Sequence, residues 1–189
     1  MMLKTIIRDA ISYIVLTGAV SRSPRLTLIW LKYIRPLIWG RPSAAIPSPD
    51  CDLIISCPCA CGSTALTAYL RKWNPSRKII CVTHYPSVVM YCVANDIPCV
   101  VLSRSLIAYL LSTTDRWNVE PFTALRHYVN YYKTVYPHTG EVVVVEFERL
   151  LVDPVAVVDE INRVYGVNIE AGDGRLPYIR TSTGDSTDE

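Results

Sequence analysis

The first candidate for chemistry is a short loop that leads from an apolar run into a helix. The residues Cys61, Gly62, Ser63 and Thr64 follow the run 52–57 and open a helix predicted over 63–73. Free backbone N–H groups and the helix dipole favour negative charge at such a helix start, and hydroxyl groups add donors. The pattern predicts a phosphate cradle; a simple capped helix is the alternative.

A histidine follows the second apolar run, 78–83. The segment Thr83-His84-Tyr85-Pro86 ends this run and begins a helix predicted over 86–95. A general base needs to lie within hydrogen-bond reach of the proton that it takes. We predict that His84 points into the same crevice as the loop and acts as this base. A packed or solvated histidine is the alternative interpretation.

An arginine follows the third apolar run, 98–103. Arg104 comes directly after it, and Ser112 follows eight residues later in a helix predicted over 105–117. A guanidinium group binds two oxygens of an anion at once, and a helix serine donates a further hydrogen bond. The pair predicts a second anion site, unless Arg104 is only an exposed residue at a helix start.

These residues need elements that bring them together, and the chain alternates between short apolar runs and helices. A fourth run covers 141–146, and two more helices are predicted over 120–136 and 154–165. Solidly apolar strands alternating with helices predict an α/β fold with a parallel sheet covered on both faces. Ligands of such sheets bind at the carboxyl ends of the strands.

Taken together, these sites resemble the sulfotransferases that use 3′-phosphoadenosine-5′-phosphosulfate (PAPS). The segment 58–64 is similar to their 5′-phosphosulfate loop, 83–86 to the segment with their catalytic histidine, and Arg104 with Ser112 to their 3′-phosphate motif. The segment 143–154 is similar to their strand with a following aromatic residue. The resemblance spans roughly 51–166 and implies a three-layer sandwich of P-loop NTPase-like sulfotransferase topology.

The resemblance also implies roles for individual residues. His84 is the expected general base. PAPS, which leaves as 3′,5′-adenosine bisphosphate, is the expected cofactor, and no metal is expected. Phe147 is expected near the adenine, and Arg175, in a loose counterpart of a late glycine-rich segment, near the 3′-phosphate. The full expected cofactor set is Cys61, Gly62, Ser63, Thr64, Arg104, Ser112, Phe147 and Arg175.

The loop departs from the family at one position. The family has Lys or Arg there, and this chain has Cys59 or Ala60. Arg71, Lys72 or a residue of the N-terminal segment is a possible replacement for the cation. A sulfotransferase-like module that binds a nucleotide without catalysis is therefore a rival hypothesis. A nucleotide kinase is disfavoured because no lysine precedes Ser63 and Thr64.

All seven cysteines lie between positions 51 and 99. Such clustering in apolar runs is not typical of a secreted disulfide framework and favours reduced thiols in a cytoplasmic protein. Cys57, Cys59 and Cys61 alternate along the chain, so a metal or redox site is an alternative to small apolar packing residues.

The chain is predicted to divide into a basic helical arm over 1–45, the α/β domain over 46–170 and a polar acidic tail over 171–189. The arm carries a net charge of +6 and the rest −4, so the total of +2 gives no reason to expect nucleic acid. The arm is expected either to pack on the domain or to contact a membrane surface; its first apolar patch also resembles a signal-peptide core.

The acceptor is expected to be a small molecule, a carbohydrate or a lipid, and the oligomeric state is left open. The tyrosines of the helix over 120–136 are predicted either to pack in the core or to line an acceptor pocket. These residues are Tyr128, Tyr131, Tyr132 and Tyr136. No apolar stretch reaches 18 residues, so a spanning helix is not expected.

Overall fold

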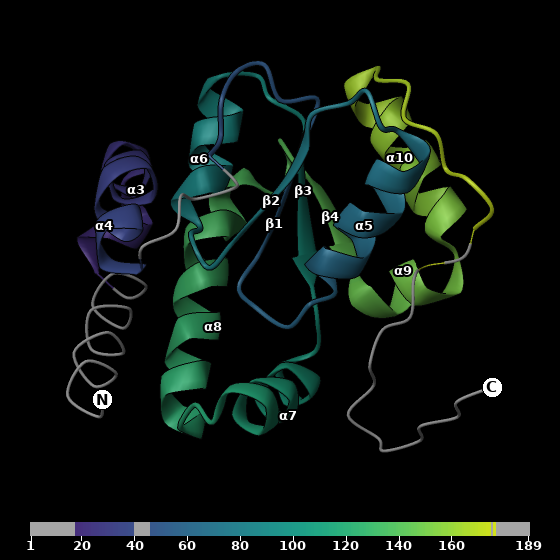
Figure 1. Ribbon diagram of the computed structural model, residues 1–189. Coiled ribbons are helices and arrows are strands. Elements are labelled where there is room, and N and C mark those ends of the chain that lie inside the picture. Colours follow the sequence, from purple (N-terminus) through teal and green to yellow (C-terminus); the bar gives the residue numbers. More distant parts are fainter. Residues whose placement is uncertain (1–17, 40–45, 175, 177–189) are drawn as a thin grey trace.

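A four-stranded parallel sheet forms the centre of the computed structural model, which describes residues 18–39, 46–174 and 176 (Figure 1). The strands are β1 (Leu53–Cys57), β2 (Ile79–Thr83), β3 (Cys99–Ser103) and β4 (Val143–Glu146). They lie in the order β2-β1-β3-β4, with Ile54 of β1 paired to Ile80 on one side and Cys99 on the other. The predicted α/β class with a parallel sheet is confirmed.

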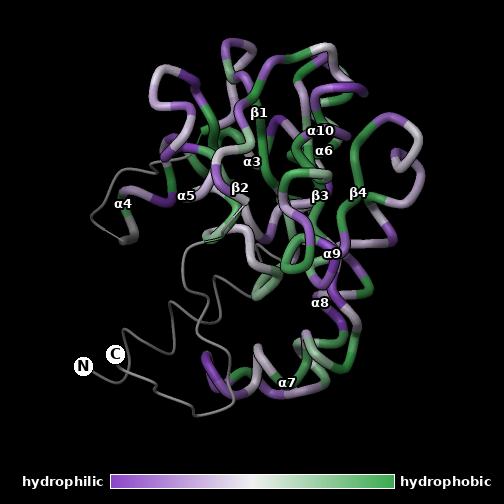
Figure 2. The backbone as a smooth tube through the Cα atoms, turned by 90° about the vertical axis from the view of Figure 1, so that its right-hand side faces the viewer, coloured by the Kyte–Doolittle hydropathy of each residue, from purple (hydrophilic) through white to green (hydrophobic). Residues whose placement is uncertain are grey.

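Helices cover both faces of this sheet, and two apolar clusters fill the space between the layers. Residues of α5 and α10 pack on one face, and residues of α6 and α8 pack on the other. The helices of the domain are α5 (Ser63–Trp73), α6 (Ser87–Ala94), α7 (Leu106–Trp117), α8 (Pro121–Val135), α9 (Phe147–Val152) and α10 (Pro154–Tyr165), with a 3₁₀ turn η2 (Tyr136–His138). Figure 2 shows the strands as hydrophobic segments inside the molecule.

Local sequence explains where these elements begin and end. The carboxylate of Glu120 accepts hydrogen bonds from the first N–H groups of α8, and Asp153 accepts one at the start of α10. Both helices have proline in the first turn, where no N–H partner is needed. Gly166 ends α10 in the left-handed conformation, at φ 63°.

The structure differs from the sequence-based expectation at the β4 edge. Val144 and Glu146 are exposed while Val143 and Val145 are buried, so β4 alternates as an edge strand that is covered on one face. The chain then forms the short helix α9, which the sequence analysis did not predict, and Phe147 is its first residue.

The described part of the N-terminal arm packs on the domain. It comprises α2 (Ala19–Arg22), α3 (Pro24–Ile29), a π-helical turn η1 (Trp30–Ile34) and α4 (Arg35–Trp39). The hydroxyls of Thr27 and Ser87 lie 2.6 Å apart, and the Trp30 indole N–H donates to the Tyr85 hydroxyl at 2.9 Å. The arm therefore lies against the start of α6, outside the layer that covers the sheet (Figure 1).

Parts of the predicted domain division fall outside the described residues, namely 1–17 and 40–45 of the arm and most of the tail. Among the helices that the structure does describe, none has both the length and the apolar character needed to cross a bilayer.

Candidate functional site

The candidate site lies at the carboxyl ends of β1 and β3, which are neighbours in the sheet although β2 lies between them in sequence. The chain runs from β1 to one side of the sheet and then crosses to the other side. Ligands of doubly wound folds bind where the strand order reverses in this way. The loop 58–62 follows β1 at this point, and Arg104 follows β3.

Gly62 carries the chain from the loop into α5. It adopts a left-handed conformation at φ 76°, and no side chain caps the N–H groups of the helix that follows. A Cβ atom at Gly62 would lie 2.2 Å from the Phe147 ring, so the aromatic ring from α9 lies directly over the glycine. The two residues meet across 85 positions of sequence because β4 delivers Phe147 to the same edge of the sheet.

Arg104 lies between the loop and this ring. Its guanidinium carbon is 4.9 Å from the centre of the Phe147 ring, and Nη1 donates to the Ala60 carbonyl oxygen at 2.8 Å. Nε is buried and has no hydrogen-bond partner, and none of the ion pairs among the described residues involves Arg104. The structure thus brings Gly62, Arg104 and Phe147 together at the loop and leaves a buried donor unsatisfied.

His84 lies on the other side of the loop, at the end of β2. Its backbone N–H donates to the Cys57 carbonyl at 2.9 Å, and its φ of 75° is unusual for a residue other than glycine. Burial, together with the nearby His127, lowers the pKa of His84 to about 3. A hydrogen bond with the Pro58 backbone acts in the opposite direction and raises this pKa. The imidazole is therefore neutral at physiological pH.

A second histidine, His127, was not singled out by the sequence analysis. The two imidazole ring centres lie 5.7 Å apart. His127 is 8% exposed, its Nδ1 lies 2.9 Å from the Tyr109 hydroxyl, and its Nε2 is buried with no hydrogen-bond partner. Burial lowers the pKa of His127 as well. The only sequence signal is its helical spacing with the buried Ala124 and Tyr131 of α8, which is also the spacing of a core residue.

Other predicted residues lie in different surroundings. Ser63 is buried, and its hydroxyl lies beside the sulfurs of Cys57 and Cys81 rather than at the surface of the loop. Cys61 is also buried, and its thiol donates to the Cys59 carbonyl at 2.8 Å. Thr64 is exposed, and Ser112 is buried in α7. Arg175 lies outside the described residues.

The cysteines of the loop are packed as apolar residues. Cys57, Cys59 and Cys61 are all buried, and burial raises the pKa of Cys59 to about 12. Within the ranges that the structure describes, no group of three or more histidine, cysteine or acidic side chains has an arrangement that holds a metal ion.

Three arginines can be compared as replacements for the basic residue that the loop lacks. Arg71 donates to the Ile79 carbonyl at 2.8 Å, at the amino end of β2, and is turned away from the loop. Two others act on the site: Arg35 of the arm contributes to lowering the pKa of His84, and Arg116 of α7 opposes the raised pKa of Cys59. The candidate edge thus has cations nearby from the arm and from α7.

The tyrosines of α8 support the end of β3. Tyr128 donates to the Arg104 carbonyl at 2.9 Å and Tyr132 to the Leu102 carbonyl at 3.1 Å, while Tyr131 is fully buried against Ser56. Only Tyr136 of the four is exposed. Tyr128 and Tyr132 are half-buried against the core, and their hydroxyls hold the backbone that presents Arg104.

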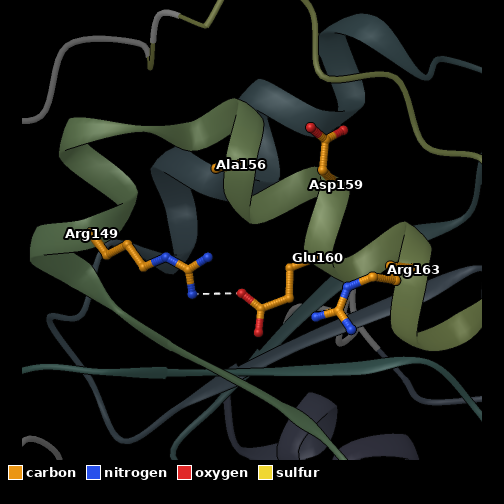
Figure 3. Close-up of a pocket in the computed structure, with 5 residues that line it drawn as sticks. All are labelled: Arg149, Ala156, Asp159, Glu160 and Arg163. Carbon is orange, nitrogen blue, oxygen red and sulfur yellow. Dashed lines mark ion pairs between the residues drawn. The ribbon is translucent and has the colours of Figure 1, made fainter.

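A cavity of about 510 Å³ lies elsewhere, on the side of α10. Figure 3 shows Arg149 of α9 directed toward Glu160 of α10, with Arg163 beside them. Arg149 and Glu160 form an ion pair with an N–O distance of 2.5 Å. Ala156 and Asp159 complete the lining. None of the residues predicted for the site takes part in it.

No family model, curated protein or solved structure matches this chain. The case for a function therefore rests on the residues and their geometry.

Proposed function

We propose that the chain binds a 3′-phosphoadenosine nucleotide at the β1–β3 edge and transfers the sulfuryl group of PAPS to an acceptor hydroxyl or amine. The observation that carries this proposal is the Arg104 guanidinium, which is stacked on Phe147, anchored to Ala60 and left with a buried Nε that has no acceptor. A buried donor without a partner costs free energy, and an anion bound at this edge would supply the missing acceptor.

The order of the strands in the sheet supports this proposal. The strand order β2-β1-β3-β4 puts the loop after β1 at the switch point, and the uncapped start of α5 offers backbone N–H groups to a phosphate. Phe147, which lies over Gly62 and beside the Arg104 guanidinium, is proposed to lie near the adenine. The acceptor is proposed to be a small molecule, a carbohydrate or a lipid.

In the proposed reaction the acceptor oxygen attacks sulfur while the bond from sulfur to the 5′-phosphate oxygen breaks. His84 takes the proton of the acceptor, and 3′,5′-adenosine bisphosphate leaves with the electron pair of the broken bond. Charge builds on the departing oxygen, so donors at the start of α5 stabilise it. The neutral His84 imidazole has a lone pair available for the proton at physiological pH, although its lowered pKa makes it a weak base.

A second candidate is a module that binds the nucleotide without transfer. Two observations favour it: the loop has Cys59 and Ala60 where the family has a cation, and Ser63 is buried against cysteines. Both features remove stabilisation of the departing oxygen without removing Arg104 from the expected phosphate site.

Binding tests the shared part of both candidates. We expect 3′,5′-adenosine bisphosphate to raise the melting temperature more than ATP with magnesium does. Arg104→Ala should weaken binding by about tenfold to a hundredfold, because a charge-assisted hydrogen bond is lost. Arg163→Ala, in the separate cavity beside α10, is the matched control and should bind normally. Equal affinities in the wild type and Arg104→Ala would contradict the site.

Turnover separates the two candidates. Radiolabelled PAPS incubated with a panel of hydroxyl and amine acceptors should yield labelled product if the chain is a transferase. His84→Gln should abolish this transfer and leave the affinity for 3′,5′-adenosine bisphosphate within about twofold of the wild type. Binding without transfer to any acceptor would favour the non-catalytic module, and full transfer by His84→Gln would refute the base assignment.

A further inference from the structure

The outward face of the arm carries a row of large apolar side chains, here termed the arm stripe: Leu26, Ile29, Tyr33 and Leu37. They fall three or four residues apart, which places them on one side of a helix. All four are exposed, and Leu37 has 84% of its surface accessible. Side chains of this size exposed as a continuous row indicate an interaction surface rather than isolated surface residues.

The fold does not use this face. Packing on the domain is supplied by other residues of the same segment, because Thr27, Trp30 and Leu31 are buried. Thr27 contacts Ser87, and Trp30 donates to Tyr85. The arm is therefore seated on the domain by one side, and the arm stripe faces away from it.

Cations accompany the arm stripe. Arg22, Arg25 and Lys32 are all exposed, and the Lys32 ammonium lies 5.1 Å from the centre of the Tyr33 ring. No acidic residue occurs between Asp9 and Asp50. An apolar row bordered by lysine and arginine, with an aromatic residue that has a polar tip, is the pattern of a helix that lies in a membrane interface.

We propose that the arm stripe and its three cations, Arg22, Arg25 and Lys32, dock the protein onto an anionic lipid bilayer surface. Apolar side chains enter the boundary between headgroups and acyl chains, and the basic groups pair with anionic headgroups. The negative charge of the rest of the chain keeps the domain on the water side. The preceding segment 1–17 is a less suitable cover, because Lys4 and Arg8 outnumber Asp9 and bring like charge to a basic face.

Co-sedimentation of the full chain with vesicles tests the proposal. Vesicles that contain phosphatidylserine should bind the protein, vesicles of phosphatidylcholine alone should bind it far more weakly, and added salt should release it. Lys32→Gln should weaken binding about fivefold. Leu37→Ser should weaken it about tenfold, because the apolar contribution is lost.

Two control variants match these changes in chemistry on another helix. Phe122→Ser removes a side chain that is 67% exposed on α8, and Lys133→Gln removes an exposed cation from the same helix. Both should bind vesicles like the wild type, and all four variants should keep the wild-type melting temperature.

Several results would overturn the proposal. One is equal binding to the two kinds of vesicle, and another is unchanged binding of both arm variants. A third is concentration-dependent self-association that Leu37→Ser abolishes in the absence of vesicle binding, which would assign the face to a second copy. None of these measurements uses PAPS, so their outcome is independent of the proposed enzymatic function.

Discussion

At the scale of single residues, the candidate site depends on a close contact between a glycine and an aromatic ring. Gly62 has a positive φ and no room for a Cβ atom beneath Phe147. Any side chain there is strained by the backbone and by the ring, so the position requires glycine.

Gly62→Ala is therefore expected to lower the free energy of unfolding by about 1–3 kcal/mol. Urea denaturation measures the change. Gly140→Ala is the control, because a Cβ atom at Gly140 meets nothing within 4 Å. A loss of similar size in both variants would contradict the contact with Phe147, and Gly62→Ala combined with Phe147→Leu should recover part of the loss.

The lowered pKa values of His84 and His127 predict that the stability of the fold depends on pH. The unfolded chain binds protons at the ordinary histidine pKa of 6.5, whereas the folded chain has a His84 pKa of about 3 and a lowered His127 pKa. The unfolded state thus binds more protons between these values. Stability is fully present above pH 6.5 and falls as the pH drops toward 3.

Urea midpoints measured between pH 7.5 and pH 4.5 should show this fall, and the fall should be smaller in His84→Gln. Acidic residues with lowered pKa values, such as Asp52, contribute in the same direction only near and below the ordinary aspartate pKa of 3.8. A His84→Gln variant with the full wild-type slope around pH 6 would show that the imidazole is not the titrating group.

At the scale of elements, the contact between the arm and the domain makes a specific prediction. Trp30→Phe removes the indole N–H that donates to Tyr85 and should cost about 1 kcal/mol. Trp73→Phe is the matched control, because the buried indole N–H of Trp73 has no hydrogen-bond partner. Free energies of unfolding from urea titrations should therefore differ between the two variants; equal losses would argue against the hydrogen bond.

Most strands and helices were readable from the sequence because local signals mark them. Two helices agree with their predicted bounds to the residue, Ser63–Trp73 and Pro154–Tyr165. Gly62 marks the start of the first helix, and the pair Asp153-Pro154 marks the start of the second. The short helix α9 follows β4 directly and has no side-chain cap, so no local signal separates it from the strand.

The candidate site was only partly readable. The positions of Arg104 and His84 follow from the rule that parallel strands end at one edge. The burial of Ser63 depends on Cys81 from another strand, and the approach of His127 depends on how α8 packs. Both are tertiary contacts between segments far apart in sequence, and no residue pattern encodes them locally.

At the scale of the whole molecule, one side chain joins distant parts of the domain. The Asn74 amide donates to the Leu70 and Glu170 carbonyls, and its oxygen accepts from the Glu170 N–H at 2.8 Å. Asn74 is buried at the end of α5, and Glu170 follows α10. This asparagine therefore links the end of the domain to the helix that follows the candidate loop.

Asn74→Ala should lower the free energy of unfolding by about 1–3 kcal/mol, since it removes two part-buried hydrogen bonds between Asn74 and the Glu170 backbone. Asn95→Ala is the control: Asn95 is exposed and bonds only within the end of α6. Thermal or urea unfolding of both variants measures the difference. Equal and small losses would show that the long-range link contributes little.

The hydrogen bond from Trp30 to Tyr85 has a consequence for how the molecule works as a unit. Tyr85 is the immediate neighbour of His84, and the same turn is held from the other side by Cys57. A contact that holds the arm in place therefore also restricts the movement of the His84 imidazole. A chain shortened to begin at residue 46 would lose the hydrogen bond to Tyr85, and the turn at His84 would keep its backbone bond to the Cys57 carbonyl.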